Sequence, residues 1–170
     1  MNAAACADTV PPLIALDAEV VLRSVSGVRT MKLADLFVRP YHTKATPDEI
    51  LTEIRFAKLP PGAKSCFIKL GRRNALSISR LSVAAVVVRD ASGTITDARI
   101  VPGATFPVWR RVEEAERMLI GERPSVELQR AVGNAVSGMM ITETGRRWST
   151  EYKEPVIAAL VRRAIEECCA

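Results

Sequence analysis

The sequence has few of the residue types from which most catalytic and metal centres are built. Among its 170 residues there is one histidine, and the four cysteines are Cys6, Cys66, Cys168 and Cys169. None of these cysteines forms a C-x-x-C pair, and two adjacent cysteines at the end of the chain lack the spacing of metal ligands. We therefore expect no metal site in this chain, and buried or incidental thiols in a reducing compartment.

Long apolar runs and dense basic patches are also missing. No run approaches the ~18 apolar residues that a membrane-spanning helix needs. Residues 1–5 have neither the basic start nor the long apolar stretch of a signal peptide, so we expect a cytoplasmic protein. Aromatic residues make up only 5%, and the basic residues behind the net charge of +5 are scattered along the chain. A nucleic-acid role, which requires a concentrated basic face, is therefore not expected.

Motifs for nucleophilic catalysis and phosphate binding are missing as well. Ser137 lacks the glycine two residues earlier that a nucleophile elbow requires. The run Gly71-Arg72-Arg73 has a single glycine and matches neither the Rossmann nor the Walker pattern. His42 has no partner at catalytic or metal-ligand spacing, so it is interpreted as an exposed loop histidine.

The first part of the chain predicts β-structure. Residues 8–20 lead into an alternating strand, and no helix is expected before it. Residues 18–23 and 28–33 flank Gly27 and are typical of a β-hairpin.

Further along, residues 34–37 predict a short turn or helical piece, and residues 41–46 a polar loop. Residues 50–56 then alternate and predict a strand. The segment Leu59-Pro60-Pro61-Gly62 marks the expected boundary between two parts of the chain.

The remainder predicts a hairpin followed by helices. Residues 81–89 and 94–101 read as two strands around a turn at 90–93. Helices are expected over residues 111–120, from a cap at Ser125, and over residues 149–167. Because the predicted strands precede the predicted helices along the chain, the sequence indicates an α+β fold, with an antiparallel β-sheet and a C-terminal three-helix layer.

Two charged side chains stand out because of their apolar neighbours. Asp8 precedes an apolar run, where its carboxylate could accept a hydrogen bond from a sugar hydroxyl or act as an ordinary turn or cap aspartate. Lys69 lies between Ile68 and Leu70. Its ammonium must therefore reach water, a carboxylate or an electron-rich ligand. An ordinary lysine on an edge strand, with its side chain extended into water, would account for this pattern equally well.

Several segments together resemble the flavin-binding medium subunit of molybdenum hydroxylases, the family of xanthine dehydrogenase, carbon monoxide dehydrogenase and nicotinate dehydrogenase. No single segment is diagnostic, but their order and spacing extend over essentially the whole chain. The matching stretches are residues 7–20, 27–29, 33–37, 48–54, 67–73, 116–121, 149–153 and 160–164.

The resemblance implies two domains and a set of partners. Residues 1–60 would be the C-terminal remnant of the FAD-binding domain, and residues 61–170 a domain like the CO dehydrogenase flavoprotein C-terminal domain. Family members carry the glycine-rich loops that bind the FAD pyrophosphate further upstream, so FAD would be shared with a missing upstream half. Molybdopterin would be bound by a large partner subunit, and [2Fe–2S] clusters by a small one.

The resemblance also assigns roles to residues. The aspartate at the position of Asp8 bonds the ribityl chain of FAD, and the lysine at the position of Lys69 lies near the isoalloxazine ring. Arg72 and Arg73 would line the acceptor side or an interface, unless they are ordinary surface arginines. The chain would then be an electron-transfer component of an oxidoreductase complex, with no activity expected of it alone.

Two other interpretations remain open and predict different structures. A docking domain that binds no flavin would have an intact interface face and no cleft. An unrelated α+β binding module would bury Leu13, Ile14 and Leu16 inside this chain. The flavoprotein interpretation predicts that Asp8 and Lys69 face one shared cleft.

Overall fold

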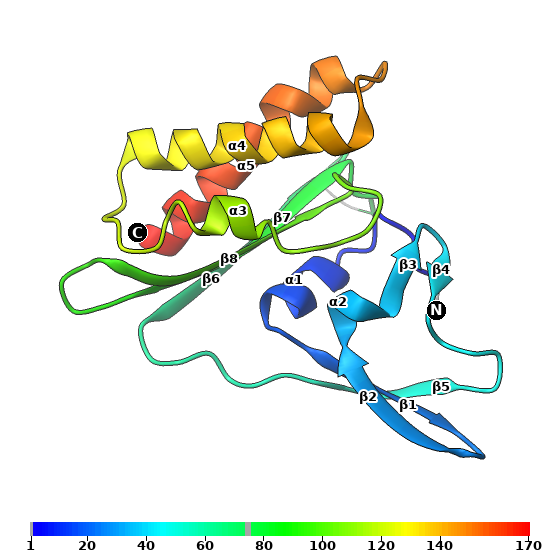
Figure 1. The fold of residues 1–170 in the computed structure, drawn as a ribbon. Coiled ribbons are helices and arrows are strands. Elements are labelled where there is room, and N and C mark those ends of the chain that lie inside the picture. The colour runs from blue at the N-terminus through cyan, green and yellow to red at the C-terminus, as the bar shows by residue number, and fades with distance from the viewer. Residues whose placement is uncertain (1, 74–75) are drawn as a thin grey trace.

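The computed structural model describes residues 2–73 and 76–170, and its elements form two groups (Figure 1). The first group lies at the lower right of Figure 1 and consists of short elements. They are α1 (Val10–Ala15), β1 (Glu19–Ser24), β2 (Gly27–Lys32), α2 (Leu33–Leu36), β3 (Phe37–Arg39), β4 (His42–Thr43) and β5 (Ile50–Arg55).

The first group is organised around an antiparallel sheet with the strand order β2-β1-β5. The hairpin between β1 and β2 forms as predicted, and Val20 of β1 lies between Met31 of β2 and Ile54 of β5. The register between β1 and β5 shifts after Val21, where the two strands are irregular. The predicted strand at residues 50–56 is confirmed as β5, and the predicted helical piece at 34–37 as α2.

Two expectations for this region were wrong. A helix, α1, precedes the first strand, because Pro11 and Pro12 occupy its first turn, where a proline loses no helical hydrogen bond. The expected polar loop at residues 41–46 contains β4, which pairs with β3 across a turn at Tyr41 in the left-handed region (φ 63°).

The second group is a three-stranded antiparallel sheet, β6-β7-β8, with helices on one side. The predicted hairpin is confirmed, and Asp90 closes its turn by accepting hydrogen bonds from the backbone N–H groups of Ser92 and Thr94. The elements are β6 (Ala63–Leu70), β7 (Leu81–Arg89), β8 (Ile95–Gly103), α3 (Glu113–Glu116), α4 (Val126–Thr144) and α5 (Thr150–Cys169).

On the helical side of the sheet, α4 and α5 are long, whereas α3 has only four residues. The predicted cap is confirmed, since Ser125 Oγ accepts from Leu128 N at the start of α4. The helix expected over residues 111–120 is present only as the four residues of α3. Backbone hydrogen bonds from Val112 N to Ile100 O and from Gly121 N to Ile95 O fix both ends of this segment to β8, which leaves room for little more than one turn.

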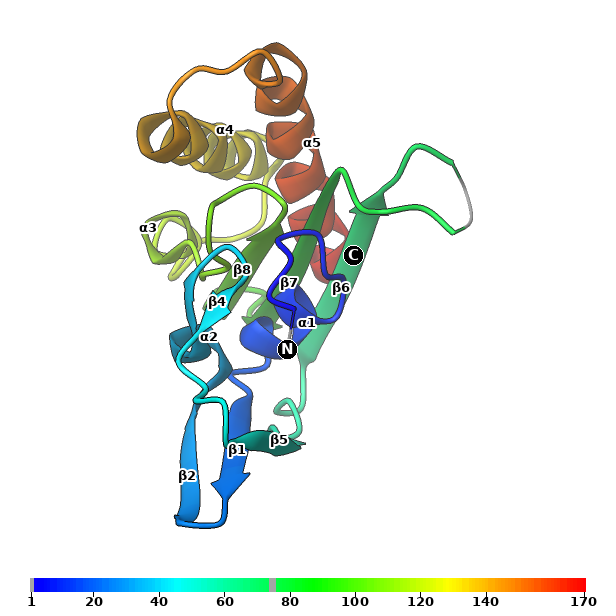
Figure 2. The ribbon, with the colours of Figure 1, turned by 90° about the vertical axis from the view of Figure 1, so that its right-hand side faces the viewer.

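The sheet β6-β7-β8 separates two hydrophobic clusters. Alternate residues of a strand point to opposite faces, so Val83, Ala85 and Val87 face the cluster formed with α4 and α5, whereas Ala84 and Val86 face the first group of elements. Figure 2 shows α5 along one face of this sheet and α1 on the other. The N-terminal group is thus held against the back of the C-terminal sheet.

Candidate functional site

The structure brings together Asp8 and Lys69, the two charged residues that the sequence singled out. Lys69 Nζ donates a hydrogen bond to Asp8 Oδ2 at 2.6 Å, and Ser79 Oγ donates to Asp8 Oδ1. Asp8 lies in the loop before α1, Lys69 near the end of β6 and Ser79 just before β7. The loop before α1 therefore meets the end of β6 and the segment before β7, both more than 60 residues away in sequence, at one end of the sheet.

The alternation of β6 explains the position of Lys69. β6 is an edge strand, and Lys69 pairs with Ser82 of β7 on the same side of the sheet as Phe67. That side faces α1, which packs on β7 and β8 and thereby carries the loop of Asp8 to the sheet. The side chains of Asp8 and Lys69 each remain 35% exposed, so the pair is accessible from outside.

The surroundings favour the ionised form of Asp8. Burial of the carboxyl group would by itself raise its pKa, but the hydrogen bonds from Lys69 and Ser79 and the positive charge of Lys69 together outweigh burial and lower the pKa. Asp8 is therefore a carboxylate at neutral pH, and its contact with Lys69 is an ion pair.

Lys69 also borders an open depression of about 420 Å³, which Arg72, Arg73 and Ser77 line with it. Asp8 does not line this depression, so a cleft shared by both charges stays a prediction. A separate apolar groove runs between Leu16, which follows α1, and Phe67 of β6. Of the three residues that a closed N-terminal region would bury, Ile14 is buried, whereas Leu13 and Leu16 are only half-buried.

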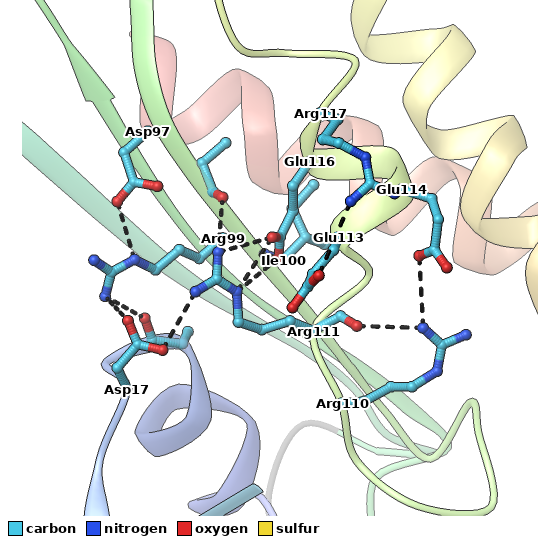
Figure 3. A network of polar contacts seen from close by, with 12 residues as sticks. Asp17, Asp97, Arg99, Ile100, Arg110, Arg111, Glu113, Glu114, Glu116 and Arg117 are labelled. Carbon is cyan, nitrogen blue, oxygen red and sulfur yellow. Dashed lines mark hydrogen bonds and ion pairs between the residues drawn. The ribbon is translucent and has the colours of Figure 1, made fainter. Parts of the chain in front are cut away.

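A second polar network, which the sequence did not reveal, joins the two groups of elements (Figure 3). Arg111 pairs with Glu116 at 2.8 Å and with Asp17 at 3.3 Å, and Arg99 pairs with Asp17 at 2.8 Å. Glu116, whose side chain is only 5% exposed, also accepts from the backbone N–H of Ile100. Because Asp17 and Arg111 are far apart in sequence, no local pattern could have predicted this contact.

The remaining candidates have structural partners. Ser137 Oγ donates to the carbonyl oxygen of Glu154 between α4 and α5, and His42 is exposed on β4. Burial raises the pKa of the Cys168 thiol to about 12, and burial together with the neighbouring Glu167 carboxylate raises that of Cys66 to about 11. In the part of the chain that the structure describes, no group of three or more potential ligands could hold a metal ion, and no helix is long and apolar enough to cross a membrane.

Comparison with known protein families decides the relationship. Residues 66–168 match the model of the CO dehydrogenase flavoprotein C-terminal domain. The chain belongs to this family. Residues 1–59 match a second model, the FAD binding domain in molybdopterin dehydrogenase. The resemblance to the medium subunits of molybdenum hydroxylases is thus confirmed.

Individual relatives agree with this assignment. The nicotine 6-hydroxylase medium subunit of Paenarthrobacter nicotinovorans is 34% identical over 158 residues, which cover 93% of this chain and 54% of the relative. The nicotinate dehydrogenase FAD-subunit of Eubacterium barkeri is 30% identical over 159 residues, 92% of this chain and 54% of that protein. This chain therefore spans about half the length of the curated relatives that it matches.

Solved structures show the same fold. Carbon monoxide dehydrogenase from Hydrogenophaga pseudoflava, in a form that lacks the Mo-pyranopterin moiety of its cofactor, superposes with a TM-score of 0.88 at 25% identity and covers 98% of this chain and 57% of that chain. Quinoline 2-oxidoreductase from Pseudomonas putida 86 gives a TM-score of 0.84 at 19% identity, over 99% of this chain and 57% of that one.

FAD is the cofactor that the family implies, and the residues present fit one end of it. The exposed ammonium of Lys69, held by Asp8 at the rim of an open depression, suits an electron-rich ring that gains negative charge on reduction. Phosphate groups need convergent backbone N–H groups, commonly from glycine-rich loops. Nothing of that kind surrounds Lys69 in the described ranges, where Gly71 is the one glycine of its depression.

Proposed function

We propose that this chain is part of the flavoprotein subunit of a molybdopterin-dependent hydroxylase or dehydrogenase. It would help to pass electrons from [2Fe–2S] clusters through FAD to an acceptor. The observation that carries the proposal is the contact between Lys69 and Asp8. The two residues come from regions that match two different family models, and the chain folds so that they meet at one accessible point.

The proposed division into two domains follows the two family matches. Residues 1–60 are the remnant of the FAD-binding domain, and residues 61–170 form the C-terminal domain. The boundary is supported by the proline-rich linker at residues 59–62, which connects β5 to β6. The phosphate-binding half of the FAD site would lie outside the residues of this chain.

Bound FAD supplies reversible two-electron chemistry, and this chain supplies charge and orientation. Lys69 would hold a positive charge beside the ring and would so favour the reduced, anionic cofactor over the oxidised, neutral one. Asp8 holds the ammonium of Lys69 in place. Its two carboxylate oxygens offer about four acceptor positions, and Lys69 and Ser79 occupy two of them. Two positions therefore remain, and a ribityl hydroxyl would donate to one of them.

The partners are those that the family implies. A large subunit would hold the molybdopterin and oxidise the substrate, and a small subunit would hold the [2Fe–2S] clusters. The complex would work in the cytoplasm. The substrate is chosen at the molybdenum centre, outside this chain.

The test is to purify the tagged chain from its native cells under gentle conditions. We expect a yellow-brown sample with flavin and iron–sulfur absorption and with larger and smaller partner polypeptides on a gel. A colourless chain without partners would contradict the proposal and would favour the alternative, a docking domain that binds no flavin.

A further inference from the structure

Ser79 carries a buried hydroxyl that contacts the charged pair of Asp8 and Lys69 from the interior of the protein. Ser79 is only 5% exposed, whereas the side chains of Asp8 and Lys69 are each 35% exposed. Ser79 Oγ donates to Asp8 Oδ1, and Lys69 Nζ donates to Asp8 Oδ2 at 2.6 Å. The two oxygens of one carboxylate are therefore held by two different donors, one buried and one accessible.

The sheet fixes the position of Ser79. The next residue, Arg80, donates its backbone N–H to the carbonyl oxygen of Leu70 at 2.8 Å, and Leu81 then pairs with Leu70 where β7 begins. Because Leu70 directly follows Lys69 in β6, the segment that carries Ser79 is fixed beside the segment that carries Lys69. Ser79 is thus attached to the sheet at the point where the charged pair forms.

The carboxylate of Asp8 depends on these donors for its orientation. Asp8 lies in the loop before α1, and it is held there by hydrogen bonds from two residues that are more than 60 positions away in sequence. The ammonium of Lys69 is a point charge on a flexible four-carbon stem, so it can follow the carboxylate into different orientations. A buried hydroxyl on a short side chain cannot follow in this way. The direction of the carboxylate is therefore set mainly by Ser79.

The hydrogen bond from Ser79 also acts on the charge of Asp8. Burial by itself raises the pKa of Asp8, and the bonds from Lys69 and Ser79 oppose it and lower the pKa. Hydrogen bonds to an ionised group are stronger than those between neutral groups, and they stabilise the ionised form. Without the hydroxyl, the half of the carboxylate that faces the interior would lose its donor.

We propose that Ser79 is a positioning residue of the flavin site. From the interior, its hydroxyl orients the carboxylate of Asp8, so that one oxygen holds Lys69 and the accessible side of the carboxylate stays free for a ribityl hydroxyl of FAD. Ser79 acts through Asp8 and needs no contact with FAD. This inference rests on the proposed function, because it concerns the same site.

The first test needs no flavin. NMR titration of the side-chain carboxyl carbon follows the pKa of Asp8 in the full chain, and we expect Ser79→Ala to raise this pKa toward its ordinary value of 3.8. The matched control is Ser137→Ala, because Ser137 is also 5% exposed and donates to a backbone carbonyl between α4 and α5. The control removes an equally buried hydroxyl and should leave the pKa of Asp8 unchanged.

The second test measures the dissociation constant of FAD in the purified complex. We expect Ser79→Ala to weaken FAD binding about two- to tenfold, the range that corresponds to the loss of one hydrogen bond, and Ser137→Ala to leave it unchanged. Asp8→Ala is the reference, since it removes the carboxylate itself. Circular dichroism of each variant checks the fold. Should the alanine variant misfold, Ser79→Cys offers a weaker donor of similar size and should raise the pKa of Asp8 as well.

Each outcome decides the inference. A raised pKa of Asp8 and weaker FAD binding in Ser79→Ala, with neither change in Ser137→Ala, would support it. An unchanged pKa of Asp8, or equal effects in the two serine variants, would overturn it. Weaker FAD binding in Asp8→Ala but not in Ser79→Ala would overturn the role of Ser79 and leave the proposed function intact. Unchanged FAD binding in both variants would overturn the inference together with the place of Asp8 in the flavin site.

Discussion

The two halves of this chain differ in how they obtain a hydrophobic core. From β6 onward, the sheet, α4 and α5 build a continuous cluster of buried residues by themselves. The elements up to β5 build a smaller cluster, and it is completed by Ala84, Val86, Val101 and Trp109 of the C-terminal half. The N-terminal half also leaves Ile50 70% and Phe56 55% exposed on or beside the edge strand β5. The core of the C-terminal half is therefore self-sufficient, whereas that of the N-terminal half depends on its neighbour.

A polar connection reinforces this dependence. Asp17 lies in the loop after α1, and its backbone is in the left-handed region (φ 53°). Its carboxylate forms ion pairs with Arg99 and Arg111. Arg111 is in turn held by Glu116. The N-terminal half is thus attached to the sheet both by apolar contacts and by this network.

The largest expected effect comes from breaking the network at its buried member. Glu116→Ala leaves the guanidinium of Arg111 without its buried partner and the N–H of Ile100 without an acceptor, and we expect a loss of about 3–5 kcal/mol in the free energy of unfolding. Chemical denaturation measures it. The control, Arg117→Ala, removes a surface pair with Glu113 and should change stability by less than about 1 kcal/mol. Equal effects would show that the buried pair of Glu116 and Arg111 does not stabilise the chain.

A slightly smaller effect should distinguish the halves from each other. Leu22→Ala opens a cavity in the smaller cluster and should cost about 2–4 kcal/mol. Hydrogen exchange should then accelerate in β1, β2 and β5, while the amides of β7 and α5 keep their protection. Uniform acceleration across both halves would mean that the chain unfolds as one unit, and it would contradict the independence of the C-terminal core.

The fold of the C-terminal half was largely predictable, because its signals are local. The β-branched run of β7, the turn at Asp90 and the cap at Ser125 each specify structure from neighbouring residues. The length of α3 was not predictable, since backbone bonds to a distant strand set it. The N-terminal half was harder because its local signals are ambiguous. Its helix α1 carries two prolines in the first turn, a pattern compatible with a turn as well as with a helix.

The candidate site was predictable only in part. Asp8 and Lys69 were singled out from their neighbours and from a family resemblance, and the structure brings them into contact. Ser79 could not be predicted, because its role depends on the path of the segment before β7. The network of Asp17, Arg111 and Glu116 depends on a contact across most of the chain length.

A smaller effect is expected at the ion pair between the halves. The lowered pKa of Asp8 means that its pair with Lys69 contributes stability above the unfolded pKa of 3.8, and that this contribution is lost as the pH falls through the lower folded value. Asp8→Asn should therefore cost at most about 1 kcal/mol at pH 7, because the pair is partly exposed. The difference from the wild type should shrink in acid. A constant difference across pH would contradict the ion pair.

The smallest effect concerns thiol chemistry in the C-terminal half. With pKa values of about 11 and 12, Cys66 and Cys168 carry almost no thiolate at pH 8. We expect both to react with iodoacetamide far more slowly in the native chain than in urea. Peptide mass mapping measures this, and rapid native labelling of Cys168 would show that the packing of α5 against β7 is looser than described.

The most direct test of the flavoprotein assignment is the flavin midpoint potential of the purified complex with Lys69→Met. Loss of a cation beside the ring should make the potential more negative, and roughly 30 mV corresponds to about 1.4 kcal/mol for a two-electron couple. Lys64→Met removes a lysine from the opposite face of the same strand and should leave the potential unchanged. A shift in the Lys69 variant alone is the predicted result. Identical potentials in the wild type and both variants would contradict a place for Lys69 beside the flavin.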